Sequence, residues 1–304
     1  MREFESHDSI ANQHLHLTGA MSLGYLREAA TEQGLSLAQY GELEAKKFDE
    51  PDIWELAKHI TSTRDGLRGA LDHVVASELQ NGVTGVELTL NPFGMIRRGM
   101  TVDEIVDAVR ASAETARANG VTLGVRPGVN RKDGPETVGL VASVYEALPE
   151  EIALGIDLNG DERAYSTTEF IDAFGRLSAN GIPVALHAGE FLDQTESLRT
   201  ALRARPQRIG HAVAVAADPS LLAGIEKSGA TIEVALTSNL SRGVVENVAD
   251  HPIRSFVERG VPVVFGTDDP TFFGNTMSDE FALLGAAGVI RGKSGELSLG
   301  GDYV

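Results

Sequence analysis

In the stretch Gln13-His14-Leu15-His16-Leu17, His14 and His16 are two residues apart, so on a β-strand their side chains would point to the same side. Seven later runs are rich in apolar and β-branched residues, and each leads through a polar cluster into a longer segment of helical periodicity. Eight strands that alternate with helices in one undivided chain predict βα units with a parallel sheet. Their number favours a closed (β/α)8 TIM barrel over an open doubly wound sheet. The later runs are Val83–Leu90, Val121–Val125, Ile152–Leu158, Pro183–His187, Arg208–His211, Ala230–Leu236 and Val261–Gly266.

The connections between the runs predict how the helices are distributed. Residues 20–80 are too many for one crossover, so extra helices are expected between the first and second strands. Thr101-Val102-Asp103-Glu104 reads as a capping box, and the helix that it begins should end at Asn119-Gly120. No linker or shift of composition divides the chain. We therefore expect a single domain over 1–304, with a loosely ordered Gly- and Ser-rich tail at 291–304.

The composition restricts the chemistry that the chain can support. The sequence contains no cysteine, which excludes disulfides, thiolate nucleophiles and sulfur-based zinc sites. It has 26 basic and 44 acidic residues, and the formal charge of −18 at pH 7 disfavours nucleic acid as a partner. No apolar run is long enough to span a membrane, and the first residues lack the apolar core of a secretory signal. We expect no membrane partner and a cytoplasmic location.

Residues able to bind a metal gather at the predicted strand ends. The first, fifth and sixth runs end in four of the eight histidines, His14, His16, His187 and His211, and Asp268-Asp269 follows the eighth run. The carboxyl ends of all strands of a parallel barrel meet on one face, so these side chains should converge there. Several buried imidazoles beside a carboxylate are difficult to satisfy by hydrogen bonds alone. We interpret the group as a metal site.

The residue types also restrict the metal. Imidazole and carboxylate ligands suit Zn²⁺, although Fe, Co and Mn are chemically possible. Two-metal barrel hydrolases commonly bridge their ions with a carboxylated lysine, and no run here ends in lysine, so we expect one ion per chain. The remaining histidines fall in predicted helices or loops and receive no function: His7, His59, His73 and His251.

Five motifs stand at the ends of predicted strands. They are His14-Leu15-His16-Leu17-Thr18-Gly19, Gly155-Ile156-Asp157-Leu158-Asn159-Gly160-Asp161-Glu162, His187-Ala188-Gly189-Glu190, Arg208-Ile209-Gly210-His211 and Thr267-Asp268-Asp269-Pro270. In composition and order they resemble the motifs of the adenosine deaminase family. The similarity extends from His14 to about Phe281, which is nearly the whole chain.

The resemblance implies that one zinc ion is bound by His14, His16, His187 and Asp268. His211 would hold and orient the attacking water molecule, with Asp268 also within reach as a base. A metal ion lowers the pKa of a bound water molecule from about 15.7 to about 7, so that a nucleophile forms at neutral pH.

The resemblance also implies which residues hold and protonate the substrate. Glu190 would donate a proton to the ring nitrogen beside the attacked carbon, because the attack breaks the aromaticity of the ring. Asp269 would pair with the far ring nitrogen, and His16, Thr18 and Gly160 would complete the substrate contacts. These roles describe a hydrolytic deaminase that converts an aminopurine or a purine nucleoside-like substrate to its oxo product and releases ammonia.

The sequence departs from the family pattern where the substrate is expected. Thr18 stands where the family usually has an acidic residue that binds the sugar hydroxyl, Thr89 replaces a usual arginine, and Ala235-Leu236 replaces Cys-Pro. Apart from Arg126 and Arg131, basic residues are sparse around the strand ends, and no Gly-rich phosphate loop follows a strand. We expect a neutral aminated heterocycle, with or without a sugar, rather than a phosphorylated nucleotide.

Two other functions use the same residue types. A related barrel hydrolase could act on a cyclic amide or another specialised heterocycle, but that reaction needs no ring-protonating acid, so Glu190 and Asp269 argue against it. A non-catalytic barrel could bind nucleosides, but it need not keep metal ligands and an acid together. Asp157, Asp161 and Glu162 are explained by helix capping or ion pairs as well as by substrate contact.

Overall fold

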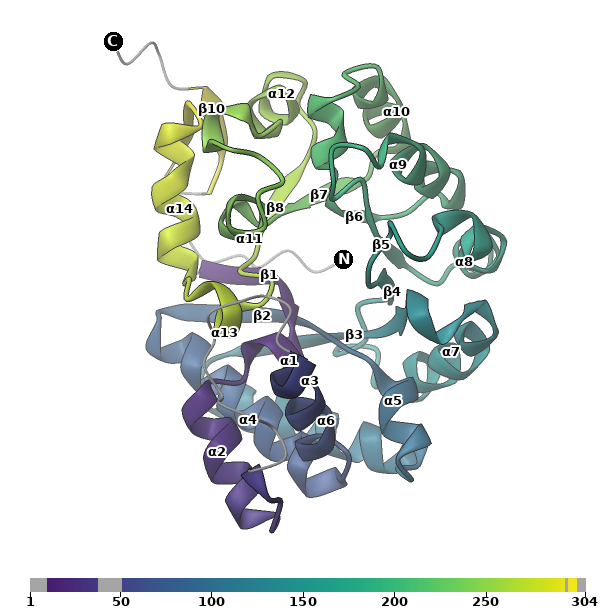
Figure 1. Cartoon of the computed structure of the whole chain (residues 1–304), viewed down its shortest axis with the longest axis vertical. Coiled ribbons are helices and arrows are strands. Elements are labelled where there is room, and N and C mark those ends of the chain that lie inside the picture. The colour runs from purple at the N-terminus through teal and green to yellow at the C-terminus, as the bar shows by residue number, and fades with distance from the viewer. Residues whose placement is uncertain (1–9, 38–50, 293–294, 300–304) are drawn as a thin grey trace.

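The computed structural model describes residues 10–37, 51–292 and 295–299, and they form a barrel of eight parallel strands. Each strand pairs with the next in sequence, and Figure 1 shows them in a ring with helices outside. The ring closes where the His16 amide donates to the Asp268 carbonyl at 3.0 Å and the Asp268 amide donates to the His14 carbonyl at 2.9 Å. The predicted (β/α)8 TIM barrel is confirmed. Its strands are β1 (Ile10–His16), β2 (Val83–Leu90), β3 (Thr122–Asn130), β4 (Ile156–Asn159), β5 (Val184–Ala188), β6 (Arg208–His211), β7 (Thr231–Val234) and β8 (Val263–Phe265).

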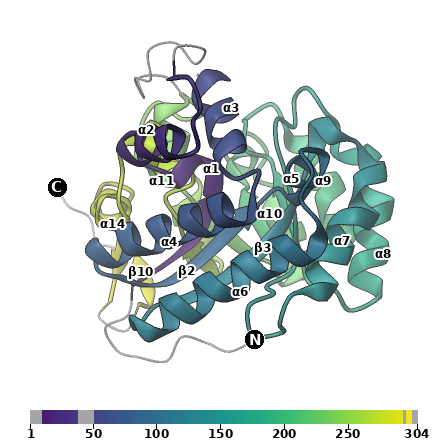
Figure 2. The same ribbon diagram turned by 90° about the horizontal axis from the view of Figure 1, so that it is seen from below.

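Helices cover the outside of this ring. Between β1 and β2 the described residues form α1 (Leu17–Ala20), α2 (Leu23–Glu32), α3 (Pro51–Ile60) and α4 (Arg64–Gln80), which confirms the extra helices predicted there. In Figure 2, α4 and α6 lie side by side across the outside of β2 and β3. The later helices are α5 (Pro92–Arg97), α6 (Val102–Ala118), α7 (Val138–Ala147), α8 (Ile171–Ala179), α9 (Thr195–Ala201), α10 (Leu221–Ser228), α11 (Leu236–Ser241), α12 (Ile253–Glu258), α13 (Pro270–Phe273) and α14 (Met277–Ala286). The short 3₁₀ turns are η2 (Arg131–Asp133), η3 (Pro135–Thr137), η4 (Thr167–Glu169), η5 (Leu202–Ala204), η6 (Val213–Ala216) and η7 (Val248–Asp250).

Helix α6 shows why these segments fold where they do. The Thr101 hydroxyl accepts from the Glu104 amide at 3.2 Å, and the Glu104 carboxylate accepts from the Thr101 amide at 2.8 Å. This reciprocal pair is the predicted capping box, and it satisfies two amides that a helix start would leave unpaired. Ile105 and Val109, one turn apart, are completely buried on the face toward the barrel. The helix ends before Asn119-Gly120, where glycine takes the left-handed φ of 78°.

Strands β3 and β4 have boundaries that the hydrophobic pattern did not predict. β3 continues through Pro127 and Gly128, because Pro127 pairs with Leu90 of β2 and the residues from Gly128 onward pair with β4. A Cβ atom on Gly128 would lie 2.5 Å from the Asn159 side chain, so this close approach requires glycine. β4 begins only at Ile156, because Gly155 has a φ of 133° that interrupts an extended run.

The tail that was expected to be loosely ordered is regular over three residues. Leu297–Leu299 forms β10, which pairs in antiparallel fashion with β9 (Val289–Arg291). The Gly295 amide donates to the Gly292 carbonyl at 3.0 Å and tightens the turn between the two strands. Residues 293–294 and 300–304 lie outside the described residues. Within the described ranges, no helix combines the length and the apolar character needed to cross a membrane.

Candidate metal centre and active site

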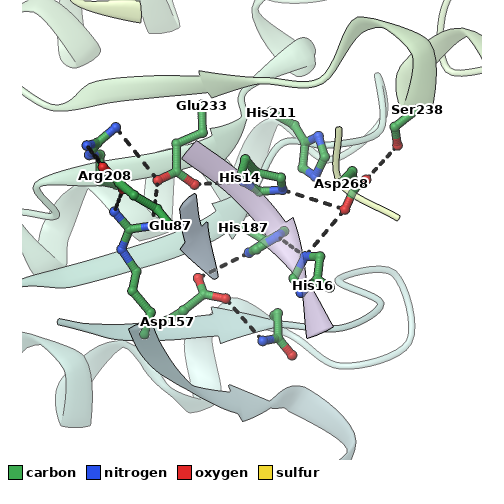
Figure 3. A network of polar contacts seen from close by, with 12 residues as sticks. His14, His16, Glu87, Asp157, His187, Arg208, His211, Glu233, Ser238 and Asp268 are labelled. Atoms are coloured by element: carbon green, nitrogen blue, oxygen red, sulfur yellow. Dashed lines mark hydrogen bonds and ion pairs between the residues drawn. The ribbon is translucent and has the colours of Figure 1, made fainter. Parts of the chain in front are cut away.

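The predicted strand-end side chains come together at the carboxyl end of the barrel. His14 and His16 extend from β1, His187 from β5 and His211 from β6, while Asp268 follows β8 (Figure 3). Neighbouring imidazole rings have centroids 4.7–5.4 Å apart. Candidate ligand atoms within 4.8 Å of one another form a group of His14, His187 and His211 and a second group of His14, His16 and Asp268. Motifs that are distant in sequence therefore share one centre.

Two carboxylates orient the ring nitrogens of this cluster. The Nδ1 atom of His14 lies 2.7 Å from Glu233, and that of His187 lies 3.1 Å from Asp157. An ionised carboxylate only accepts, so each Nδ1 carries the proton and each Nε2 directs a lone pair toward the centre. The buried Nε2 of His14 has no hydrogen-bond partner among the described residues, and the Nε2 atoms of His16 and His187 are 3.1 Å apart. Converging lone pairs of this kind fit a bound cation.

The protonation states of His16, His211 and Asp268 also fit a bound cation. Burial lowers the pKa of His16 to about 4 and the pKa of His211 well below its usual value, so both imidazoles are neutral. Burial alone would raise the pKa of Asp268, but the imidazole of His14, whose Nε2 lies 3.6 Å from it, outweighs burial and keeps this carboxyl ionised. The Ser238 hydroxyl also donates to Asp268 at 2.6 Å. Against the effect of burial, the acidic neighbours Asp268 and Glu233 raise the pKa of His14, and Asp157 raises the pKa of His187. A cation bound there would displace a proton from each ring, because neutral imidazole and ionised carboxylate are the forms that bind a metal ion.

The backbone at the site is held in unusual conformations. His211 and Asp268 have φ values of 69° and 62°, in the left-handed region that few non-glycine residues adopt. Each such residue costs on the order of 1–3 kcal/mol and persists only where its surroundings hold it. A Cβ atom on Gly19 would lie 1.8 Å from Oδ1 of Asp269, so this motif glycine makes room for an acid of the site.

A chain of hydrogen bonds behind His211 gives it a different tautomer. The Ile253 backbone amide donates to Nδ1 of His251 at 3.1 Å, so the ring proton of His251 is on Nε2. That nitrogen lies 3.3 Å from the side-chain oxygen Oδ1 of Asn239. The Asn239 amide nitrogen then faces Nδ1 of His211 at 3.3 Å. His211 therefore carries its proton on Nε2 and presents a donor to the centre, unlike His14 and His187. His251, which received no function from the sequence, is part of this chain.

A buried ion network lies beneath His14 inside the barrel. Arg126 pairs with Glu87 at 2.5 Å and with Glu233 at 3.3 Å. Arg208 approaches Glu87 at 3.4 Å (Figure 3). Glu233 thus holds His14 while arginines hold Glu233. Arg131 is also buried, and it donates to the carbonyl oxygen of His187 at 2.6 Å.

A buried carboxylate positions the turn that carries Glu190. Instead of capping the helix that follows it, Glu162 accepts the backbone amides of Gly189 at 2.8 Å, Glu190 at 2.7 Å and Phe191 at 3.3 Å. It also accepts from the Ser197 hydroxyl. Asp157 likewise has a definite partner in His187, whereas Asp161 accepts from the Arg163 amide in a local turn.

Two buried acids stand beside the histidine cluster. Burial raises the pKa of Glu190 to about 7, against the opposing charge of Arg242, which contacts it. The nearer Glu190 oxygen is 3.9 Å from Nε2 of His211. Burial and the adjacent Asp268 raise the pKa of Asp269, whose Oδ1 has no hydrogen-bond partner among the described residues. Glu190 can therefore hold a proton near neutral pH, and Asp269 keeps its proton to a higher pH than an ordinary aspartate does.

The cluster opens into a cavity of about 870 Å³. Thr18 and Gly160 line this cavity together with His16, Glu190 and Asp269, so the predicted substrate contacts share one space. The expectation that basic residues are sparse near the strand ends is wrong, because the connecting segments bring six of them to the wall: Lys58, Arg97, Arg98, Lys132, Arg163 and Arg242. Of the histidines without an assigned role, His7 lies outside the described residues.

Comparison with known proteins places these features in a family. The sequence model of the family described as adenosine deaminase matches residues 10–288. An aminodeoxyfutalosine deaminase of Acidothermus cellulolyticus is 30% identical over 291 residues, which cover 91% of this chain and 82% of that protein.

Solved structures show the same fold. An N6-mAMP deaminase of Arabidopsis superposes with a TM-score of 0.81 at 18% identity, covering 95% of this chain and 90% of that one. An amidohydrolase of Burkholderia ambifaria with bound zinc superposes with a TM-score of 0.79 at 21% identity, covering 91% and 80%. The chain belongs to the adenosine deaminase family and is an aminohydrolase that acts on a C–N bond.

Proposed function

We propose that the chain is a zinc-dependent deaminase that converts an aminopurine or a purine nucleoside-like substrate to its oxo product and releases ammonia. The observation that carries this proposal is the juxtaposition of a histidine and aspartate cluster with two buried carboxyl groups in one cavity. Family membership supports the reaction type.

The proposed ligands are His14, His16, His187 and Asp268, with one ion per chain. Three imidazoles and a carboxylate suit Zn²⁺, and the zinc in the Burkholderia ambifaria structure supports this choice. Zn²⁺ held there would lower the pKa of a water molecule and prepare it for attack on the ring carbon. None of the eight strand runs ends in a lysine that could bridge a second ion.

The remaining residues of the site would orient and move protons. The Nε2 proton of His211 can hydrogen-bond to the attacking water, while Asp268 can accept the proton that the water loses. Glu190 would donate a proton to the ring nitrogen beside the attacked carbon, where the electron pair arrives when aromaticity is broken. Asp269 would hydrogen-bond to the far ring nitrogen, and Thr18 and Gly160 would line the bound substrate with His16.

Hydrolysis of a cyclic amide is the second candidate, since it uses the same ligands. That reaction does not need an acid at a ring nitrogen, so it leaves the burial of Glu190 beside His211 without a chemical purpose. The two candidates therefore differ in what they require of Glu190.

A panel of aminopurines, purine nucleosides and pteridines, assayed for ammonia release by the zinc-loaded protein, tests the proposal. Glu190→Gln should reduce kcat by about 10²–10⁴-fold, the usual contribution of a general acid, without changing the zinc content. Glu146→Gln, an exposed change on α7, is the matched control and should have no effect. Near-normal turnover by Glu190→Gln would remove Glu190 from the mechanism and favour the amide hydrolase.

A further inference from the structure

The cavity has a second, positively charged end away from the strand-end ligands. We call it the cationic end and define it by Lys58, Arg97, Arg98 and Lys132, all of which line the cavity. Lys58 lies on α3, the two arginines lie at the end of α5, and Lys132 lies in η2. These segments follow β1, β2 and β3 in turn, and Figure 1 shows α3 and α5 in the same lower half of the molecule as those strands.

The carboxylates nearby do not balance these charges. Glu55 is shared, because it pairs with Lys58 at 2.6 Å and with Arg98 at 3.2 Å. Asp133 is the second carboxylate of this part of the cavity wall. Among the residues that the structure describes, which leave out 38–50 before α3, four cationic side chains and two carboxylates leave two positive charges uncompensated, in a chain whose formal charge is −18.

The arrangement of the two lysines indicates what could balance them. Burial and the neighbouring charge of Lys58 both lower the pKa of Lys132, so the two ammonium groups stand close enough to repel each other. Repulsion between two ammonium groups destabilises the folded chain. An anion between them would turn the repulsion into two attractive contacts.

The size of the cavity allows a substrate to reach both ends. Its volume of about 870 Å³ lies near the upper limit of the 300–1,000 Å³ that is usual for small-molecule sites. A purine ring held beside Glu190 and Asp269 would leave much of this space empty. Asn91, Asn130 and Asn159 also line the cavity. A polar substituent on the ring would therefore have room to extend within the same cavity toward Lys58 and Lys132.

The other basic residues of the cavity are already engaged. The Arg163 guanidinium lies 3.7 Å from the centre of the Phe191 ring and pairs with Asp161 at 3.2 Å. The Arg242 guanidinium lies 4.9 Å from the centre of the same ring and contacts Glu190. The uncompensated charge therefore belongs to the cationic end.

We propose that the cationic end binds an anionic group, a phosphate or a carboxylate, on the substituent of a purine-type substrate. This inference rests on the proposed function for the orientation of the ring, and it replaces the expectation of a neutral substrate. Lys58 and Lys132 are its principal contacts, and Arg97 and Arg98 add positive charge at the rim.

Matched probes test the proposal in two ways. The first comparison is kcat/KM for adenosine, adenosine 5′-phosphate and adenosine 5′-carboxylate, which separates phosphate from carboxylate. The second is the Kd of inosine and inosine 5′-monophosphate by calorimetry, which requires no turnover. Both comparisons use the wild-type protein, Lys58→Met, Lys132→Met and Arg163→Met. Lys227→Met, an exposed change on α10, is the control.

The wild-type protein should favour at least one anionic probe over its neutral counterpart by about tenfold to hundredfold, the effect of one hydrogen bond between charged groups. Lys58→Met and Lys132→Met should each remove most of that preference and leave adenosine turnover within about twofold, while Lys227→Met changes neither. Equal handling of neutral and anionic probes, or a preference that depends on Arg163 instead, would overturn the proposal. Glu190-dependent turnover of adenosine without any anionic preference would refute the cationic end alone. Absence of turnover and of binding for every probe would refute the proposed function with it.

Discussion

Replacing Glu162 by glutamine tests whether the position of Glu190 depends on the Glu162 carboxylate, which binds the turn that carries Glu190. One oxygen of Glu162 accepts the amides of Glu190 at 2.7 Å and Phe191 at 3.3 Å, and the other accepts the Gly189 amide at 2.8 Å and the Ser197 hydroxyl. Glutamine has nearly the same size, but one of its two polar atoms is an NH₂ group that only donates. In either orientation of the new side chain, at least one backbone amide of the turn faces a donor.

The expected magnitude follows from burial. Glu162 is 4% exposed, so water does not replace the lost acceptor. A buried donor without a partner costs about 1–3 kcal/mol, and the free energy of unfolding should fall by that amount. Relief of the clash requires the turn to move, and a displacement of about 1 Å at a catalytic group can reduce the rate about 10²-fold. We expect kcat to fall by about that factor, with a smaller change in KM.

The assay combines urea unfolding, ammonia release and zinc analysis of Glu162→Gln. Glu196→Gln on α9 is the matched control, because its side chain is 80% exposed and the chemical change is identical. The control should remain within about 0.5 kcal/mol of wild type and keep full activity. Unchanged kcat and stability in Glu162→Gln would refute the positioning argument. Loss of zinc together with activity would show that Glu162 supports the ligand cluster rather than the Glu190 turn.

Three further outcomes follow from the site. Protein purified without chelator should contain close to one equivalent of zinc, and His16→Ala should lose most of it; a requirement for two equivalents would contradict the mononuclear assignment. His251→Leu removes the donor that orients the side chain of Asn239 and, through it, His211. We expect kcat to fall about tenfold to hundredfold at unchanged zinc content. An unaltered kcat would show that other contacts set the tautomer of His211. Thr18→Asp should raise kcat/KM for adenosine relative to adenine by about tenfold to hundredfold, since a carboxylate holds a sugar hydroxyl more firmly than a hydroxyl does; an unchanged ratio would place Thr18 away from the sugar.

The barrel could be predicted from the sequence because each strand carries its own hydrophobic run. The boundaries of β3 and β4 could not, because Pro127 and Gly128 look like a turn when read locally. Their extended conformation comes from pairing of Pro127 with β2 and of Gly128 with β4, and from the close approach of Asn159 to Gly128. Pairing between strands, which a local pattern does not contain, thus extended β3, while the φ of Gly155 set the start of β4.

The residues of the site also divide into those that a local sequence pattern predicts and those whose contacts arise only in the folded chain. His14, His187 and Asp268 stand at strand ends, and the geometry of a parallel barrel is enough to predict that they meet. Glu233 and Glu162 lie in contact with partners 219 and 27 residues away in the sequence, and no spacing indicates those contacts. Ser238 and Asn239 follow the seventh run, where turn chemistry alone explains such a pair. Their partners Asp268 and His211 are visible only in the folded chain.

The division between strand ends and connecting segments also explains why the reaction could be predicted more easily than the substrate. The proposed ligands and acids follow strands whose ends the ring holds in place, so one set of motifs defines the chemistry. The cationic end is built from α3, α5 and η2, and its key residue Lys58 belongs to the long connection for which the sequence predicted only extra helices. Whether Lys58 faces Lys132 depends on how α3 packs across the mouth of the barrel, and no local pattern encodes that packing. Differences in the charge of the substrate between this chain and its relatives should therefore be sought in these three segments rather than at the strand ends.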